Sequence, residues 1–256
     1  MERDELRQRI SGYCKQLKLS QRVVTLCEES AHREQEQFLH DVLHSEVEHR
    51  NHSRRVKRLN RANFPSRKSL DDFDFSHVKF PSGVTVEDLA DGHYIRQKQN
   101  LIFYGQVGTG KTHLAIALGM LACEQDYAVG YYTLSDLVLS LGEAHRNGTL
   151  ERLVHAIQGL DLLILDEWGY VPVDRQGSQL LFRVIADCYE RKSLIVTTNI
   201  EFSSWGSIFT DEQMAAAMID RLVHHGYLIL CGGPSYRIAN ALMRQNALGI
   251  QEVGMT

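Results

Sequence analysis

Residues 101–113 read LIFYGQVGTGKTH. The apolar residues from Leu101 to Tyr104 predict a short buried strand, and the apolar run from His113 to Cys123 predicts a helix. Between them, Gly105 to Thr112 match the pattern G-x-x-x-x-G-K-T in the strand–loop–helix context that this motif requires. The sequence therefore predicts a phosphate-binding loop (P-loop) in an α/β nucleotide-binding domain.

The P-loop residues suit a nucleotide phosphate chain. Glycines let the backbone approach the phosphates, so that successive N–H groups and the helix N-terminus point at negative charge. Lys111 is expected to reach the terminal phosphates and Thr112 to ligate Mg²⁺. A string of this kind arises by chance in about 1% of chains of this length, so a ligand-free glycine turn is the weaker interpretation. The residues expected to contact ATP are Gly105, Gln106, Val107, Gly108, Thr109, Gly110, Lys111, Thr112 and His113, together with Arg237 near the end of the chain.

A second motif ends another predicted strand. Leu162 to Leu165 are apolar, and Asp166 and Glu167 follow them directly. In parallel α/β sheets, ligands bind at the carboxyl ends of the strands. Asp166 is therefore expected to help hold Mg²⁺, and Glu167 to activate the water that attacks the γ-phosphate. An acidic pair that only caps a helix is the alternative.

Three further polar residues are candidates for the same site. Asn199 follows the predicted strand 194–198 and could orient the attacking water, although it could also simply begin a turn. Arg221 ends a predicted helix, either as an arginine finger acting on a neighbouring subunit or as a surface residue favoured by the helix dipole. Arg237 is a weaker candidate of the same kind.

Strands and helices alternate through most of the chain. This order predicts a mainly parallel sheet covered by helices on both faces. The expected strands are 101–104, 128–133, 162–166, 194–198 and 227–231, and the expected helices are 113–123, 134–144, 150–158, 179–191 and 214–224.

The N-terminal region has a different character. Residues 2–61 contain no proline, and Phe38, Leu39, Val42, Leu43 and Val47 recur with the spacing of one helix face. Pro65 and the polar residues after it mark a boundary. We therefore expect a small helical domain over residues 1–64, a linker over 65–75 and the ATPase domain over 76–256.

Charge is unevenly distributed between the two regions. Residues 1–70 contain 15 Lys and Arg against 10 Asp and Glu, whereas the remainder contains 13 against 22. Residues 50–68 contain no acidic residue, which predicts a basic stripe on a helix that contacts DNA phosphates. An ordinary solvated helix face is the alternative. The residues expected to bind DNA are Arg50, Arg54, Arg55, Lys57, Arg58 and Arg61.

Composition excludes several classes of protein. No apolar run approaches the ~20 residues that a membrane span needs, and the first residues do not resemble a signal peptide. The five cysteines form no C-x-x-C pair and are expected to be reduced. His224 and His225 are interpreted as helix-end residues rather than metal ligands. We expect a cytoplasmic protein that does not associate with membranes.

Five segments together resemble the IstB-type helper ATPases of insertion sequences, which are relatives of DnaC-type helicase loaders in the AAA+ class. The segments are GQVGTGKTHLAIA (105–117), LLILDEWGY (162–170), IVTTN (195–199), IDRL (219–222) and SYR (235–237). The resemblance implies an AAA+ fold, ATP-driven homo-oligomerisation as a ring or spiral on double-stranded DNA, and delivery of that DNA to a partner transposase. It also implies that Asn199 is the sensor 1 residue and Arg221 the arginine finger.

Two features depart from this pattern. Only 19 residues follow Arg237, too few for the helical lid domain of many AAA+ proteins, so a standard sensor 2 is expected to be absent or replaced by Arg237. Trp168 stands where a smaller aliphatic residue is expected, and the sequence offers no physical reason for it.

Two other functions remain open. A DnaC-like helicase loader would use its N-terminal helices to grip a replicative helicase, and would co-purify with that helicase rather than with a transposase. An unrelated P-loop kinase is disfavoured because the sequence contains no second substrate motif.

Overall fold

The computed structural model describes residues 2–170, 172–209 and 211–239. The chain forms two compact units, the first up to Lys57 and the second from Arg58 onward. The first unit contains α1 (Arg3–Gln16), α2 (Arg22–Ser30) and most of α3 (Arg33–Ala62). Its core gathers apolar side chains from all three helices, including Leu6, Cys27 and Leu43.

A buried carboxylate joins the helices of the first unit. The side chain of Glu36 on α3 is fully buried and receives hydrogen bonds from Arg3 Nε (2.8 Å) and Arg7 Nη2 (2.7 Å) on α1. The Arg3 guanidinium, helped by Arg7, lowers the pKa of Glu36 below its ordinary value even though burial opposes the shift. Because a buried charge must be paired, this cluster fixes α1 against α3.

The second unit is built on one mixed sheet. In its described part, the strand order is β1-β6-β2-β5-β4-β3, with β1 antiparallel to β6 and the other neighbours parallel. The strands are β1 (Val78–Lys79), β2 (Asn100–Tyr104), β3 (Val129–Thr133), β4 (Leu162–Trp168), β5 (Ser193–Thr198) and β6 (Gly226–Cys231). The predicted P-loop α/β fold is confirmed.

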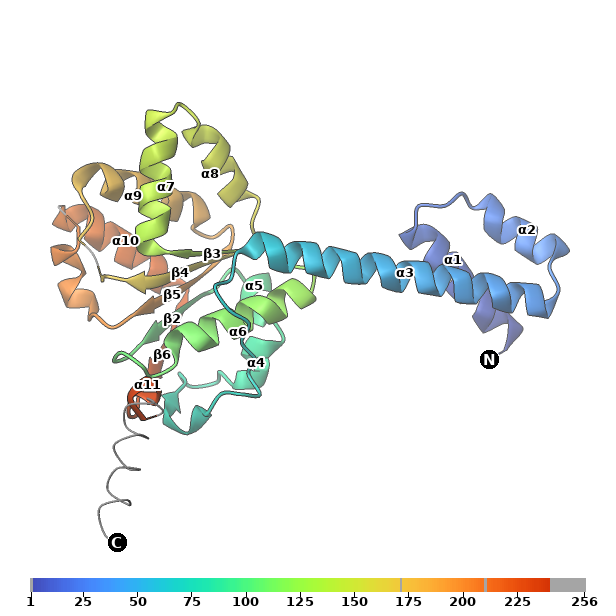
Figure 1. Cartoon of the computed structure of the whole chain (residues 1–256), viewed down its shortest axis with the longest axis horizontal. Helices are drawn as coiled ribbons and strands as arrows, with labels where there is room; N and C mark the ends of the chain where they lie inside the picture. The colour runs from blue at the N-terminus through green and yellow to red at the C-terminus, as the bar shows by residue number, and fades with distance from the viewer. Residues whose placement is uncertain (1, 171, 210, 240–256) are drawn as a thin grey trace, which may run out of the picture. The chain divides into compact units, whose positions relative to one another are not determined.

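Helices cover both faces of this sheet (Figure 1). One face packs against α6 (Lys111–Glu124), with α4 (Val86–Ala90) and α5 (His93–Arg96) beside it. The other face is covered by α7 (Leu134–Arg146), α8 (Leu150–Gln158), α9 (Arg175–Cys188) and α10 (Glu212–His224). Alternate residues of β2 face opposite cores, with Leu101 and Phe103 in one and Ile102 in the other.

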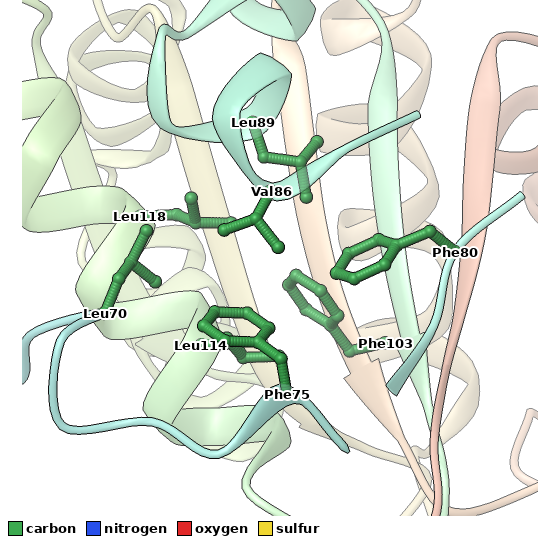
Figure 2. A pocket seen from close by; sticks show the side chains of 8 residues that line it. All are labelled: Leu70, Phe75, Phe80, Val86, Leu89, Phe103, Leu114 and Leu118. Atoms are coloured by element: carbon green, nitrogen blue, oxygen red, sulfur yellow. The ribbon is translucent and has the colours of Figure 1, made fainter. Parts of the chain in front are cut away.

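The segment that precedes β2 folds over α6 and completes the core on the α6 side of the sheet. Figure 2 shows the apolar side chains that line a small void at this place, contributed by this segment, β2 and α6. The void has a volume of about 10 Å³, which is the space of a single water molecule. With an entirely apolar lining, the void is a packing defect rather than a ligand site. The lining residues are Leu70, Phe75, Phe80, Val86, Leu89, Phe103, Leu114 and Leu118.

One predicted helix is displaced from its expected position. The sequence predicts a helix over 179–191, but α9 begins at Arg175 because the side chain of Asp174 caps it by accepting the N–H of Gly177 (2.7 Å). It ends at Cys188, since Tyr189 leaves the helical conformation and Glu190 has a positive φ of 55°. The prediction was therefore wrong at both ends.

Several short elements were not predicted. They are β1, α4, α5, the 3₁₀ helices η1 (Phe75–His77) and η2 (Phe202–Ser207), and α11 (Tyr236–Ala239). Within the ranges that the structure describes, no helix combines the length and the apolar character that a membrane crossing requires.

Candidate functional site

The P-loop lies between β2 and α6, where its backbone makes close contacts that only glycine allows. Gly108 and Gly110 have φ angles of +85° and +91°. A Cβ atom on Gly105 would lie 1.9 Å from the carbonyl oxygen of Cys231, and one on Gly110 would lie 2.4 Å from the ring of Phe73. The loop is therefore held between β6 and the segment that precedes the sheet.

Lys111 opens α6 and points back into the loop. Its Nζ donates hydrogen bonds to the carbonyl oxygens of Gly105 (2.8 Å) and Gln106 (2.7 Å). Burial lowers the pKa of the ammonium group, while Cys231 and Asp166 oppose the shift. A bound phosphate group would displace these two carbonyl groups from the ammonium group, because a negatively charged acceptor forms a stronger hydrogen bond with a cation than a neutral carbonyl does.

Next to Lys111, three hydroxyl groups converge on Asp166 at the end of β4. Thr112 Oγ1 donates to Asp166 Oδ1 (3.0 Å), as does Thr197 Oγ1, and the hydroxyl of Tyr131 donates to Oδ2 (2.6 Å). The carboxylate is 2% exposed. Its contact with Thr112 places a hydroxyl and a carboxylate oxygen side by side, and oxygen ligands of this kind suit Mg²⁺. The two predicted metal ligands thus fit the ion.

A β-bulge separates the environments of Asp166 and Glu167. Leu165 is paired with Val196 of β5, and Trp168 is paired with Thr198, so that Asp166 and Glu167 together lie opposite Thr197. The Thr197 hydroxyl accepts the N–H of Glu167 (3.0 Å) while donating to Asp166. Glu167 has a positive φ of 60° and an exposed side chain. The bulge therefore buries one acid and turns the next one outward.

Trp168 packs in the core behind this bulge. It is fully buried, and its ring stacks on Trp205 with 4.7 Å between the centroids, with Phe209 at its edge. A smaller residue would leave a cavity beneath Glu167. The structure thus supplies the physical reason for Trp168 that the sequence did not.

Asn199 follows β5 directly. Its side-chain oxygen is buried and accepts no hydrogen bond from any residue in the described ranges. A buried acceptor of this kind is costly unless something donates to it. An amide oxygen with free acceptor capacity is consistent with a role in orienting a water molecule.

Arg221 contacts its own helix rather than the P-loop. Within the described part of the chain, its Nη1 donates to the carbonyl oxygen of Ala217 (2.7 Å), and its guanidinium lies 5.1 Å from the ring centre of Phe182. Neither contact involves the P-loop or Asp166. Within the described residues, Arg221 is therefore not part of the cluster around Lys111 and Asp166.

Arg237 lies on α11, which follows a segment that touches the P-loop. The N–H of Tyr236 donates to the carbonyl oxygen of Gly108 (3.0 Å), and the positive charge of Arg237 contributes to the lowered pKa of Lys111. His113 also meets a neighbouring segment, since its Nε2 lies 2.7 Å from the carbonyl oxygen of Ser69. Both predicted nucleotide-binding residues are thus close to the loop.

The predicted DNA-binding residues are not equally available. Arg54, Arg55, Lys57 and Arg61 are exposed. Arg50 pairs with Glu46 (2.6 Å), and Arg58 pairs with Asp126. The free positive charge of the stripe is therefore smaller than the sequence suggests.

Sequence reasoning missed Tyr131 and Thr197. Thr197 lies two residues before Asn199 but carried no predicted role, and Tyr131 lies in the middle of β3. The approach of Tyr131 to the acid arises from the parallel pairing of β3 with β4, which sets Thr133 opposite Asp166 and leaves no signal in the sequence.

Comparisons with known proteins agree with this geometry. The family model described as IstB-like ATP binding protein matches residues 14–244. The ATP-binding protein of insertion sequence IS21 from Pseudomonas aeruginosa is 36% identical over 222 residues, which are 86% of this chain and 84% of that protein. The corresponding protein of IS5376 from Geobacillus stearothermophilus is 34% identical over 246 residues, or 94% and 98% of the two chains.

Solved structures share the fold at lower identity. DnaI aligns with a TM-score of 0.54 and 20% identity, covering 67% of this chain and 91% of its own. AMPPCP-bound DnaA from Aquifex aeolicus aligns with a TM-score of 0.53 and 20% identity, covering 68% and 53%. With the P-loop and acidic pair in place and the family model spanning most of its length, this chain belongs to the IstB-like ATP-binding proteins associated with insertion sequences of the IS21 type.

Proposed function

We propose that this protein hydrolyses ATP, assembles on double-stranded DNA in the ATP-bound form, and delivers that DNA to a partner transposase. The observation that carries the ATPase part is the convergence of Thr112, Asp166 and Thr197 beside Lys111, with Glu167 exposed at the adjacent bulge.

Each site residue has a separate role in the proposed hydrolysis. The backbone of residues 105–110 and the Lys111 ammonium bind the phosphates. Thr112 and Asp166 would hold Mg²⁺, which when bound would offset the negative charge of the phosphate oxygens. Glu167 accepts a proton from the attacking water, and Asn199 orients that water.

The position of Arg221 supports the proposed assembly. Its guanidinium lies beside Phe182, and we assign it to the γ-phosphate of a neighbouring copy. Hydrolysis would then require at least two subunits. Arg237, beside the P-loop of its own chain, is proposed to report the nucleotide state as a substitute for sensor 2.

The DNA and transposase roles are supported by the charge of α3 and by the relatives of this chain. The exposed arginines and Lys57 on α3 offer phosphate contacts, and the relatives are named for insertion sequences, which move by transposition. The domain assignment of residues 1–64 as the DNA- or partner-binding part, residues 65–75 as the linker and residues 76–256 as the ATPase is part of this proposal.

Mass measurements on DNA test the whole proposal. The untagged protein would be mixed with long duplex DNA in ATP–Mg²⁺, then in ADP–Mg²⁺, and with single-stranded DNA as the comparison. Large assemblies that need both duplex and ATP are expected. Monomers that prefer single strands would instead favour a helicase loader, and an absence of phosphate release in every condition would reject the ATPase.

A further inference from the structure

Three metal-ligating side chains meet at the carboxyl end of α10, away from the P-loop residues. His224 is the last residue of α10, His225 follows it, and Glu190 lies in the turn between α9 and β5. One ligand atom from each residue lies within 4.8 Å of the other two. His225 Nε2 lies 3.0 Å from Glu190 Oε1.

A neighbouring hydroxyl group orients one of these rings. The oxygen of Tyr189 lies 2.9 Å from His224 Nδ1. When Nδ1 carries the proton and donates it to this oxygen, the lone pair of Nε2 is available to a metal. Metal-ligating histidines are almost always held by a hydrogen bond from their second ring nitrogen, so the Tyr189 contact is the support that such a ligand needs.

The electrostatic surroundings favour a cation. The carboxyl end of a helix carries partial negative charge, and α10 directs this end toward the histidines. Asp220 and His224 line the same open groove of about 540 Å³ on the surface of α10. The side chains of His225 and Glu190 are 42% and 57% exposed, so that an ion could reach them from solvent.

We propose that Glu190, His224 and His225 form a binding site for a transition-metal ion of the Zn²⁺ type. Two imidazoles and one carboxylate are a donor set that Zn²⁺ uses, with water in the remaining position. Mg²⁺ and Ca²⁺ prefer oxygen ligands, so this site is chemically different from the one formed by Thr112 and Asp166. The ion would join the end of α10, three residues beyond Arg221, to the α9–β5 turn.

Zn²⁺ titration of the untagged full chain tests the site. Competition with a chromophoric chelator would give the affinity, and Co²⁺ in place of Zn²⁺ would give the visible absorption of a low-symmetry nitrogen and oxygen site. His224→Ala and Glu190→Gln are each expected to weaken Zn²⁺ binding by at least about 10-fold, and Tyr189→Phe to weaken it less. Thermal unfolding without metal would show that each variant is folded.

His44→Ala is the matched control. His40 and His44 on α3 are a second histidine pair, with 6.0 Å between their ring centroids, and they could bind Zn²⁺ on their own. Zn²⁺ affinity that survives in His44→Ala and falls in His224→Ala supports the proposal. Equal Zn²⁺ affinity in wild type and His224→Ala, or a loss confined to His44→Ala, would overturn it. Because the readout is metal binding, the result does not depend on the proposed ATPase.

Discussion

The hydroxyl group of Tyr131 donates a hydrogen bond of 2.6 Å to Oδ2 of Asp166, so that Oδ1 faces Thr112. Burial raises the pKa of Tyr131, and Asp166 raises it further, so the hydroxyl keeps its proton over the whole working pH range. We infer that Tyr131 positions the carboxylate for the metal. Tyr131→Phe is expected to raise the Mg²⁺ concentration for half-maximal ATPase activity about 10-fold.

Tyr132→Phe provides the control for this prediction, because Tyr132 follows directly on β3 and packs against the opposite core. Nucleotide affinity in excess chelator should be the same in both variants and in wild type. An unchanged Mg²⁺ requirement in Tyr131→Phe would show that the hydrogen bond has no part in positioning the acid.

Glu167→Gln separates binding from hydrolysis. The side chain is exposed at the bulge and contributes nothing to the core, so the variant should fold and bind ATP like wild type. Loss of the proton acceptor is expected to slow phosphate release by about 100-fold or more. Glu201→Gln, another exposed acid, should keep full activity, whereas wild-type turnover in Glu167→Gln would reject its assignment as the base.

Arg221→Ala tests action between subunits. The variant should bind ATP but hydrolyse it about 1,000-fold more slowly, since an arginine finger contributes at least this factor. Lys111→Ala should fail to bind ATP, because it removes the phosphate-binding ammonium group. Mixing the two variants should restore part of the activity, since an intact finger can then meet an intact P-loop; a mixture as inactive as its components would contradict the in-trans role.

Arg54 and Lys57 lie three residues apart on one face of α3, and both are exposed. Affinity for duplex DNA falls as salt rises, so a plot of log affinity against log salt has a negative slope. Replacing both residues by Ala should make this slope shallower by about 2, one unit for each phosphate that is no longer neutralised. Replacing Lys15 and Arg22, which are exposed elsewhere in the first unit, removes the same charge and should leave the slope unchanged. Equal slopes in all three proteins would mean that Arg54 and Lys57 do not contact DNA phosphates.

Acid should destabilise the first unit, because it protonates Glu36. Its pKa in the folded state is lowered from 4.5, so the carboxylate stabilises the fold above that value, and the stabilisation is lost as the pH falls through the lowered pKa. As the pH falls below 4.5 and through the lowered pKa, the buried Cys14 and Cys27 should become reactive toward a disulfide reagent that works in acid, as located by peptide mass spectrometry. Glu36→Gln should expose them at neutral pH, whereas Glu34→Gln, at an exposed position, should behave like wild type.

The sequence predicted the features that depend on local pattern. The P-loop, the strand before Asp166 and the alternation of helices and strands follow from spacing and apolar character within short windows. The bulge at Asp166 and Glu167 could not be predicted, because it arises from the register between β4 and β5. The position of Tyr131 depends on the pairing of β3 with β4 in the same way.

Other differences have equally specific causes. The short helix α5 has four residues and follows Gly92 in a left-handed conformation, and β1 contains only two residues, so neither leaves a periodic pattern to detect. Glu190 and His224 are far apart in sequence and meet only because α9 and α10 pack together. The sequence shows only that the two histidines are adjacent, and adjacency alone supports their interpretation as ordinary helix-end residues.

The stacking of Trp168 on Trp205 places a natural fluorophore next to Glu167, the proposed base. The chain contains two tryptophans, and both belong to this stacked pair. All of the tryptophan emission thus originates from this pair, of which Trp168 directly follows Glu167. Intrinsic fluorescence of the native protein should consequently act as a built-in optical probe of the bulge, following nucleotide arrival and departure in real time.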